Sequence, residues 1–585
     1  MGKRARDSKR ESGKPASGGE SELCPLATCL LDKWAWGGLS APALQELANA
    51  ARLSGANSQA ILKMAGLGAY GAQQQNIQRD LLRNFVKEKT TPDPYIIKVP
   101  YLVGKECEVH DCELLLPHDW FAAVTSSHLV DEVVGLPELS KFWRSQKPDD
   151  PKLHANPIEQ GMIPFLLHGD GAQFQRRDSL LVTSMKSILA SSQNAFLLLA
   201  AVPKRCRYSD RSDDTWHPIW ETLCWSLGAM FEGRHPTHDE KGRPFPRGSP
   251  RQELGGKLLN PRGLRGFIYT ISGDLEYFAN ELGLAHPASQ RPCWMCRADT
   301  KDTPLNDFRP CAKWRQTIIS PEAHRRNPPT KHLLMKVPGI VAETFALDCL
   351  HTLELGVTAH TLANFMFDLV FKEIGGTRSA AVATLWNMIQ ELYRELGIDS
   401  KNRIPHLKLE SFCNRGAPWS NFPELHGIKA RETRYLVPVF CKIMGDGDDT
   451  PYKQHRRACV CNLNAAYEII DASLYRVPDS EHAKLEKSIN NFLLHYTWLS
   501  KHAFQEDLLQ WSTVPKFHIT AHLPEQAKWV SPRVGWTYGG ENMVGKISHL
   551  AMTCLDGTAA HKVGHTLMLK YGVGMHLQFQ RHVEA

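Results

Sequence analysis

The order of apolar segments between Met162 and Leu284 constrains the fold more than any other feature of this sequence. Three short apolar segments come first: MIPFLLHGDG, SLLVTSMKSILASS and NAFLLLAAVPK. Their length, their Leu, Val, Ile and Phe content and the polar turns between them predict three consecutive strands. WHPIWETLCWSLGAMFEG then shows helical periodicity, and RGFIYTISGDLEYFANELGL predicts a strand running into a helix. The predicted order is strand, strand, strand, helix, strand, helix.

This order predicts an α/β fold with a mixed sheet of the ribonuclease-H-like (RNase-H-like) kind. Asp170 closes the first predicted strand in HGDGAQF, and Asp274 closes the fourth in ISGDLEYF. Strands one and four are neighbours in such a fold, so both carboxylates are expected at one edge of the sheet. One acid at a strand end is commonly a turn residue, whereas two at matched positions indicate a site.

A third acid, Glu541, stands in YGGENMVGKISHL near the end of the sequence. The pattern after the glycines predicts a helix with Glu541 in its first turn, where a carboxylate suits the positive end of the helix dipole. Between the sheet and this glutamate the chain shows helical periodicity, for example in RSAAVATLWNMIQELYRELG. We therefore expect a large all-α insertion domain that interrupts the sheet core.

Two distant residue pairs carry the side chains of a metal site. Cys293 and Cys296 form a C-x2-C motif, and His518 and His522 form H-x3-H in PKFHITAHLPEQAK. Together they make a Cys2His2 set, which is typical of a four-coordinate structural zinc. One zinc ion would join the entrance of the insertion to its exit, although each pair alone is more often simply packed in a core. A weaker zinc candidate consists of Cys107, His110, Cys112 and His118.

The composition sets broad limits on the class of protein. The chain has 585 residues, of which 42% are hydrophobic and 22% charged, so it is long enough for several domains. Its formal charge of +7 is compatible with a polyanionic partner. No apolar run is long enough to cross a bilayer, so no membrane partner is expected. The 15 cysteines are expected to be mostly reduced thiols.

Five regions are expected along the chain. Residues 1–22 predict a disordered basic tail, in which KRARDSKR from Lys3 to Arg10 is a candidate nuclear address. The remaining regions are an N-terminal helical and connecting region (23–156), the first part of the core with C-x2-C (157–300), the helical insertion (301–512) and a final segment with H-x3-H and the glutamate helix (513–585). In the N-terminal region, Ser40 is the expected N-cap of a helix.

These motifs together resemble the transposase core of CACTA (En/Spm-type) elements and of the Kyakuja-Dileera-Zisupton group. They are more distantly similar to hAT transposases and the V(D)J recombinase core. In those families an RNase-H-like fold carries an Asp-Asp-Glu triad, a C-x2-C motif after the second Asp and a paired-histidine motif before the Glu. The spacings here are similar to theirs, with 19 residues from Asp274 to Cys293 and 19 from His522 to Glu541. HGDGAQF, ALDCLHTLELGV and KARETRYLVPV are further local matches, and the resemblance covers about residues 157–554.

The resemblance implies a DDE-type transposase, or a protein derived from one, that cleaves DNA and transfers strands between transposon ends and a target. Asp170, Asp274 and Glu541 would hold two catalytic Mg²⁺ or Mn²⁺ ions. Asp348 and His351 form D-x2-H in ALDCLHTLELGV, so Asp348 is a rival for the second acid. Asp274 is preferred because it ends a predicted strand. Nuclear localisation is expected, and a homo-oligomer is left open.

Two other classes of function remain open from the sequence. A domesticated or decayed transposase would act as a zinc protein that binds nucleic acid or protein without cutting, although the three intact acids argue against complete decay. A helical scaffold with a structural zinc and no nucleic-acid role is the third reading. The basic residues expected near phosphates are Arg176, Arg177, Lys186, Lys204, Arg205, Lys429, Arg431 and Lys546.

Overall fold

The structure is a computed structural model in which the chain forms two compact units. The first unit comprises residues 1–93 and 549–585, and the second comprises residues 94–548. The expected basic tail at 1–22, with its candidate nuclear address, lies outside the described residues. The described residues are 24–85, 91–154, 158–175, 178–191, 195–210, 214–445, 450–555 and 559–584.

The first unit is helical in its described residues. Its helices are α1 (Pro25–Ala35), α2 (Ala41–Leu53), α3 (Gln59–Ala65), α4 (Leu67–Tyr70), α5 (Gln74–Phe85) and α21 (Val563–Glu584). Ser40 caps α2 by accepting a hydrogen bond from the backbone N–H of Ala43 at 3.2 Å, as the sequence predicts. Trp34, Ile61 and Leu577 belong to its core. Residues 549–585 therefore group with the N-terminal helices, which differs from the expected 513–585 segment.

Four strands form the larger sheet, which lies in the second unit. They are β3 (Ile163–Gln175), β4 (Asp178–Ser187), β5 (Leu197–Pro203) and β6 (Gly266–Ser272). Their order is β5-β4-β3-β6; β3 pairs antiparallel with β4 and parallel with β6, and β4 pairs antiparallel with β5. Every residue of β5 and β6 is buried, which explains their uninterrupted apolar sequences.

The elements follow one another in the order that the sequence predicts. Helix α9 (Trp216–Glu232) and the short α10 (Pro250–Leu254) lie between β5 and β6, and α11 (Leu275–Asn280) follows β6. The connection through α9 provides the crossover that the parallel β3–β6 pair requires. One detail differs, because Asp170 lies inside β3, opposite Val182 of β4, and not at the end of the strand.

A hairpin and short helices precede the sheet in the second unit. β1 (Tyr95–Val103) and β2 (Glu106–Leu114) pair antiparallel as a separate two-stranded sheet. The helices that follow are α6 (Pro117–Ser126), α7 (Leu139–Ser145) and α8 (Pro151–His154). The expected connecting region at 23–156 therefore contributes to both units.

Residues 301–349 are less helical than the expected insertion. They contain α12 (Pro321–Arg326) and several short 3₁₀ turns. Phe345 makes a single parallel bridge with Ile271 of β6, so this stretch runs beside the sheet before the helices begin.

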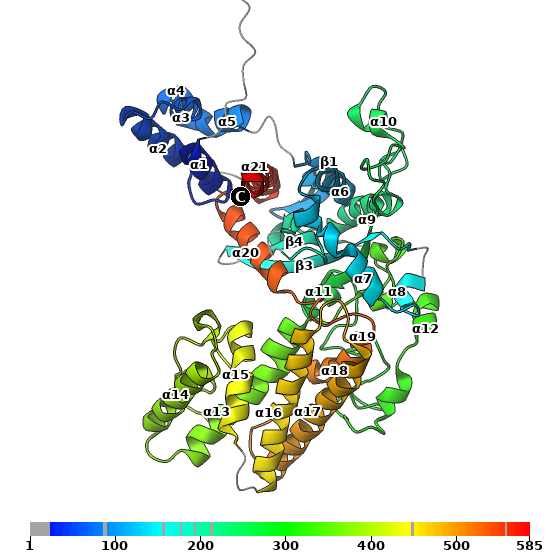
Figure 1. The fold of residues 1–585 in the computed structure, drawn as a ribbon, viewed down its shortest axis with the longest axis vertical. Helices are drawn as coiled ribbons and strands as arrows, with labels where there is room; N and C mark the ends of the chain where they lie inside the picture. The colour runs from blue at the N-terminus through cyan, green and yellow to red at the C-terminus, as the bar shows by residue number, and fades with distance from the viewer. Residues whose placement is uncertain are drawn as a thin grey trace, which may run out of the picture. The chain divides into compact units, whose positions relative to one another are not determined.

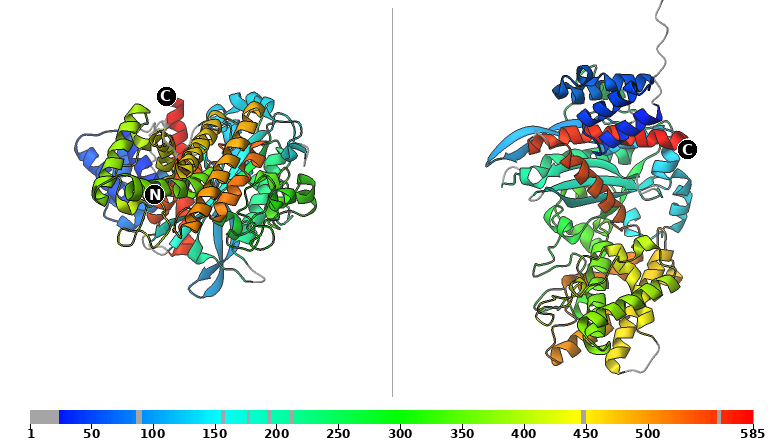
Figure 2. Two further views of the ribbon diagram at one scale, coloured as in Figure 1. Left: turned by 90° about the horizontal axis from the view of Figure 1, so that it is seen from below. Right: turned by 90° about the vertical axis from the view of Figure 1, so that its left-hand side faces the viewer.

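The chain from 350 to 527 is mainly helical, apart from largely irregular stretches at 396–429 and 506–514, and has no strand among its described residues. Its main elements are the π-helical η8 (Leu350–Thr358) and η9 (Leu369–Glu373), with α13 (Ala359–Asp368), α14 (Arg378–Glu395), α15 (Ala430–Ile443), α16 (Pro451–Ala472), α17 (Asp479–Gln505), α18 (Pro515–Ala521) and α19 (Leu523–Ala527). The long α16 and α17 lie side by side (Figures 1 and 2). Among all described residues, no helix has the length and apolar character needed to cross a membrane.

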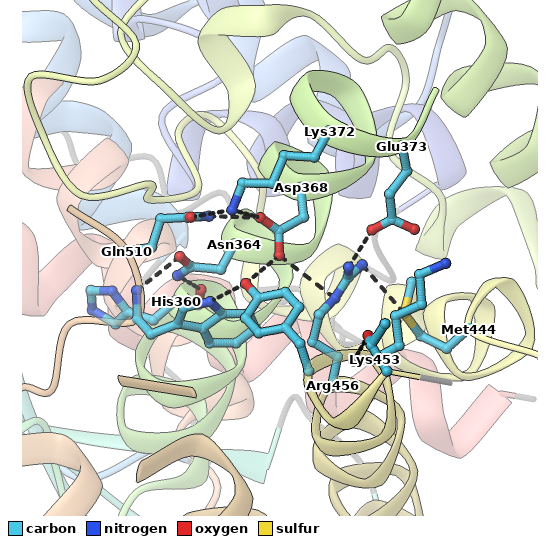
Figure 3. A network of polar contacts seen from close by, with 12 residues as sticks. His360, Asn364, Asp368, Lys372, Glu373, Met444, Lys453, Arg456 and Gln510 are labelled. Carbon is cyan, nitrogen blue, oxygen red and sulfur yellow. Dashed lines mark hydrogen bonds and ion pairs between the residues drawn. The ribbon is translucent and has the colours of Figure 1, made fainter. Parts of the chain in front are cut away.

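A buried ionic network holds this helical part together (Figure 3). Asp368 is fully buried, and its Oδ1 lies 2.8 Å from Lys372 Nζ and accepts a hydrogen bond from Gln510 Nε2 at 2.9 Å. Its Oδ2 lies 3.6 Å from Arg456 Nε, and Arg456 also pairs with Glu373. Because buried charges are tolerated only when paired in this way, the network fixes α13 against α16.

Candidate functional site

The three acids expected from the sequence come from separate elements of the second unit. Asp170 lies in β3. Asp274 follows β6 and is the N-cap of α11, where its Oδ1 accepts a hydrogen bond from the backbone N–H of Tyr277 at 2.6 Å. Glu541 lies in the first turn of α20 (Tyr538–Met552). β3 and β6 are hydrogen-bonded neighbours, which brings the first two acids to adjacent positions on the sheet.

Glu541 and Asp274 both lie close enough to Asp170 to affect its ionisation. Burial raises the pKa of Asp170 well above its ordinary value; the charge of Glu541, a hydrogen bond to Glu541 and the charge of Asp274 raise it further. The backbone N–H of Gly171 donates to Asp170 Oδ1 at 2.6 Å and opposes this shift only partly. Glu541 Oε1 is buried and has no hydrogen-bond partner among the described residues. This concentration of like charge is the arrangement that a bound cation relieves.

Asp348, the alternative to Asp274 as the second acid, contacts His351 near Glu541, and its oxygens accept hydrogen bonds from neighbouring groups. Its carboxylate accepts hydrogen bonds from the backbone N–H groups of Leu350 and His351, both at 3.0 Å, and from that of Thr537 at 3.3 Å. Its Oδ2 is also 2.6 Å from Nδ1 of the His351 ring. The oxygens of Asp348 therefore accept several hydrogen bonds, whereas Glu541 Oε1 accepts none from the described residues.

His351 links Asp348 to the acid cluster. Its Nε2 lies 3.8 Å from Glu541 Oε1, and its Nδ1 faces Asp348. Burial lowers the pKa of His351, but the hydrogen bond to Asp348 and the charges of Asp348, Glu541 and Asp274 outweigh burial and raise it to about 9. These contacts favour the protonated form of His351, whose ring is held between two carboxylates.

Two glycines allow the elements of this centre to approach closely. A Cβ atom at Gly169 would lie 2.0 Å from the Tyr277 ring at the start of α11. One at Gly540 would lie 2.4 Å from the ring of His168, which is fully buried in β3. Close backbone approach is a standard reason for glycine, and here it sets α11 and α20 against β3.

Sequence reasoning did not single out His168. Both of its ring nitrogens lack a hydrogen-bond partner among the described residues. Burial lowers its pKa to about 4, which the charge of Asp348 opposes and that of His351 reinforces. The glycines that flank each acid, in HGDG and YGGEN, were the available signal for such tight packing.

The structure brings the four expected metal-binding residues together. The ligand atoms of Cys293, Cys296, His518 and His522 all lie within 4.8 Å of one another, and all four residues are buried. Cys296 Sγ is 3.3 Å from His518 Nε2, which is 3.2 Å from His522 Nε2. The cysteines lie in the loop after α11, whereas His518 lies in α18 and His522 directly after it. This group is able to hold a metal ion.

The surroundings prepare these side chains for coordination. His518 Nδ1 is 2.9 Å from the carbonyl oxygen of Leu305; with Nδ1–H donating to it, the Nε2 lone pair faces the cluster. The Trp314 ring packs against both imidazoles, with centroids 4.8 Å from His518 and 5.0 Å from His522. A hydrogen bond from Cys293 lowers the pKa of Cys296; burial opposes this, and contacts with both histidines reinforce it. A thiolate at this position is the form that binds a metal.

A cavity of about 1000 Å³ lies in the second unit, and Tyr538 and Gly539 of α20 contribute to its wall, although none of the three acids lines it. Its basic lining residues are Lys141, Lys186, Lys401, Arg431, Arg434 and Arg533, and its acidic ones are Asp131, Glu132, Glu138 and Asp471. Arg434 pairs with Glu354 and Asp471, so its charge is neutralised locally. Burial lowers the pKa of Lys186 to about 8. Arg176 and Arg177, also expected near phosphates, lie outside the described residues.

Comparisons with known proteins assign no function to this chain, so a function has to be inferred from the geometry and chemistry of its sites. No protein-family model matches this chain, and no curated protein matches its sequence significantly. The acid cluster and the Cys2His2 group are the two features from which a function can be inferred.

Proposed function

We propose that this chain is a DDE-type transposase, or a protein derived from one, that cleaves DNA phosphodiester bonds and transfers strands. The observation that carries the proposal is the convergence of Asp170, Asp274 and Glu541 from β3, the start of α11 and α20. The strand order β5-β4-β3-β6, with β6 parallel to β3, supports an RNase-H-like core. The helical chain from 350 to 527 supports an insertion ahead of the glutamate.

Asp170, Asp274 and Glu541 would hold Mg²⁺ or Mn²⁺. Both ions prefer oxygen ligands, and Glu541 Oε1 is a buried oxygen without a hydrogen-bond partner among the described residues. Bound ions would activate the attacking hydroxyl and stabilise the leaving oxygen at a phosphodiester. The raised pKa of Asp170 fits this assignment, because three crowded carboxylates need a cation in order to ionise together.

The remaining groups of the centre orient the acids. Asp348 fixes the His351 ring through Nδ1, which directs Nε2 towards Glu541. The His351 ring, 3.8 Å from Glu541 Oε1, would limit the rotation of the Glu541 side chain. Since the oxygens of Asp348 are already occupied, this arrangement favours Asp274 as the second acid and assigns Asp348 the positioning of His351.

Cys293, Cys296, His518 and His522 would hold a structural zinc. Two thiolates and two imidazoles are a closed tetrahedral donor set, and the Leu305 carbonyl supplies the outer hydrogen bond that such histidines commonly make. The zinc would join the loop after α11 to the start of the segment that leads to α20. It would thereby bring Glu541 back to the sheet, from which the long helical segment separates it in sequence.

The cavity lined by Tyr538 and Gly539 is a suitable place for the DNA backbone. Lys186 and Arg431 line it as well, where they lie over the rings of Phe196 and Tyr538, and would contact phosphates. Phosphate contacts of this kind supply most of the sequence-independent affinity for DNA. Binding through this cavity would weaken steeply with salt.

A plasmid-nicking assay tests the proposal. The parent chain should relax supercoiled DNA with Mn²⁺ or Mg²⁺ and not with Ca²⁺, and Asp170→Asn and Glu541→Gln should each abolish this activity. Glu276→Gln is the matched control, because Glu276 is exposed on α11 two residues from Asp274. Salt-dependent DNA binding without nicking by the parent would instead select the non-catalytic, domesticated alternative. Absence of both would contradict either reading.

A further inference from the structure

A second group of metal-ligating side chains lies in the second unit, apart from both clusters described above. His118 and Asp119 stand in the first turn of α6, and His235 follows α9 in the segment that leads to α10. Their ligand atoms lie within 4.8 Å of one another. None of these residues belongs to the acid cluster or to the Cys2His2 group, so the proposed transposase chemistry does not use them.

The His118 ring is buried with one nitrogen unpaired. The residue is fully buried, and its Nδ1 lies 2.7 Å from Ser226 Oγ on α9. With Nδ1–H donating to that hydroxyl, the lone pair of Nε2 is available. Nε2 lies 3.2 Å from Asp119 Oδ1 but has no hydrogen-bond partner among the described residues. A buried polar atom left in this way is costly unless another partner, such as a metal ion, takes it.

The other two side chains are oriented by contacts outside the group. Asp119 Oδ2 accepts a hydrogen bond from Arg251 Nη2 of α10 at 2.7 Å, which leaves Oδ1 directed at His118. The backbone of His235 is held on both sides, because its N–H donates to Lys257 O and its carbonyl accepts from the N–H of Gly256, both at 2.9 Å. The His235 and His118 rings lie edge to face with centroids 6.3 Å apart. The hydrogen bond from Arg251 is of the kind that fixes a carboxylate ligand in metal sites, and the backbone contacts hold the main chain of His235 in place.

We propose that His118, Asp119 and His235 form a second metal site, for a divalent transition ion of the zinc and cobalt type. Two imidazole nitrogens and one carboxylate oxygen suit such ions better than Mg²⁺ or Ca²⁺, which prefer oxygen ligands alone. Three protein ligands leave a fourth position for water. The ion connects α6 to the segment 234–263, which carries α10.

This site replaces the weaker zinc candidate that the sequence suggests. Cys107 and His110 lie on β2, and Cys107 is exposed. Of that set, only His118 belongs to a metal-binding group among the described residues. Its partner His235 lies more than a hundred positions away and follows no motif spacing, so the sequence gives no signal for the pairing.

Cobalt titration of the full chain, freed of any affinity tag, tests the proposal. Every chain titrated, the parent included, carries Asp170→Asn so that the carboxylate cluster does not add a further Co²⁺ ion to the count. The parent should bind two Co²⁺ ions: one at Cys2His2, with an intense near-ultraviolet thiolate band, and one without that band. His235→Ala should bind only the first ion and keep the thiolate band, which shows that the fold persists. His238→Ala is the matched control on the same segment and should still bind two. A single ion in the parent, or two ions in His235→Ala, would overturn the proposal.

Proteolysis gives an independent readout that does not depend on activity. Added Zn²⁺ should protect the segment 234–263 from limited cleavage in the parent and in His238→Ala, but not in His235→Ala. Equal cleavage of the parent with and without Zn²⁺ would also count against the site.

Discussion

Among the single residues, Asp170 is the one whose proposed role in cation binding opposes the stability of the fold. It is held near Glu541 and Asp274, and its pKa is raised because burial and like charges disfavour the ionised form. Strongly shifted pKa values of this kind are found more often at functional sites than elsewhere in a fold. The carboxylate therefore costs stability whenever no divalent cation is bound.

Replacing Asp170 by Asn should stabilise the chain in buffer free of Mg²⁺ and Mn²⁺. The folded pKa lies above the unfolded value of 3.8, so the folded parent retains a proton that the unfolded chain releases. The stability of the parent therefore falls as pH rises from the unfolded pKa through the folded one. Asparagine does not ionise, so the variant does not lose stability in this way. Its free energy of unfolding should exceed that of the parent by on the order of 1 kcal/mol at neutral pH.

Thermal unfolding of parent and variant at about pH 5 and about pH 7.5 measures the difference. The stabilisation should be larger at the higher pH. A variant less stable than the parent at neutral pH, or a difference independent of pH, would contradict the crowding of these carboxylates.

Single histidines mark the limit of what the sequence could reveal at this scale. His168 follows an apolar run as a single histidine, a pattern that fits a core residue as well as a functional one, and His351 was visible only as part of the D-x2-H motif with Asp348. Only the fold brings His351 between Asp348 and Glu541. The three acids could be singled out from the sequence, because each stands where an apolar run ends or a helix begins.

At the scale of elements, α20 presents Glu541 because it packs closely on β3. The contact depends on Gly540, where a Cβ atom would lie 2.4 Å from the buried His168 ring. Gly545, five residues further along the same helix, is exposed and would place its Cβ atom in open space.

Gly540→Ala should therefore destabilise the chain by about 1–3 kcal/mol through overpacking and should reduce nicking by displacing Glu541. Gly545→Ala is the matched control and should be neutral or stabilising by up to about 1 kcal/mol, since alanine is the better helix former. Unfolding and nicking measured on both variants decide the matter. Equal behaviour of the two variants would show that the close approach of α20 to β3 is not required.

Some helices and strands follow the apolar pattern of the sequence, and others do not. Apolar runs predicted β5 and β6 well, because both strands are buried on both faces. Asp170 appeared to end its strand, because the apolar run stops there while backbone pairing with β4 continues to Gln175. Residues 301–349 were expected to be helical, but their prolines and short turns keep them largely irregular.

At the scale of the whole molecule, the Cys2His2 group joins parts of the chain that are far apart in sequence. The spacing of the two pairs predicted this group, and the four side chains do lie together. The division into two units was not predictable, because nothing in the apolar pattern of α21 indicates that it belongs with the N-terminal helices.

Zinc removal should loosen the chain locally around this group. With a zinc-selective chelator, amide hydrogen exchange should accelerate in residues 286–320 and 513–530 and should stay slow in β3, β4 and β5. Cys296→Ser should reproduce the effect, whereas Cys311→Ser, at an exposed cysteine of the same region, should not. Removal of Mg²⁺ alone should leave exchange unchanged. Unaltered exchange in a zinc-free chain would contradict a structural role for the metal.

Iron-mediated backbone cleavage tests whether Asp170, Asp274 and Glu541 bind cations at one place. Fe²⁺ in the site, with ascorbate and peroxide, cuts the polypeptide wherever the backbone lies near the ion. Fragments should end near all three residues, should be suppressed by excess Mg²⁺ and should be absent in Asp170→Asn. Cleavage near only one of the three, or a pattern unaffected by Mg²⁺, would contradict binding at one place.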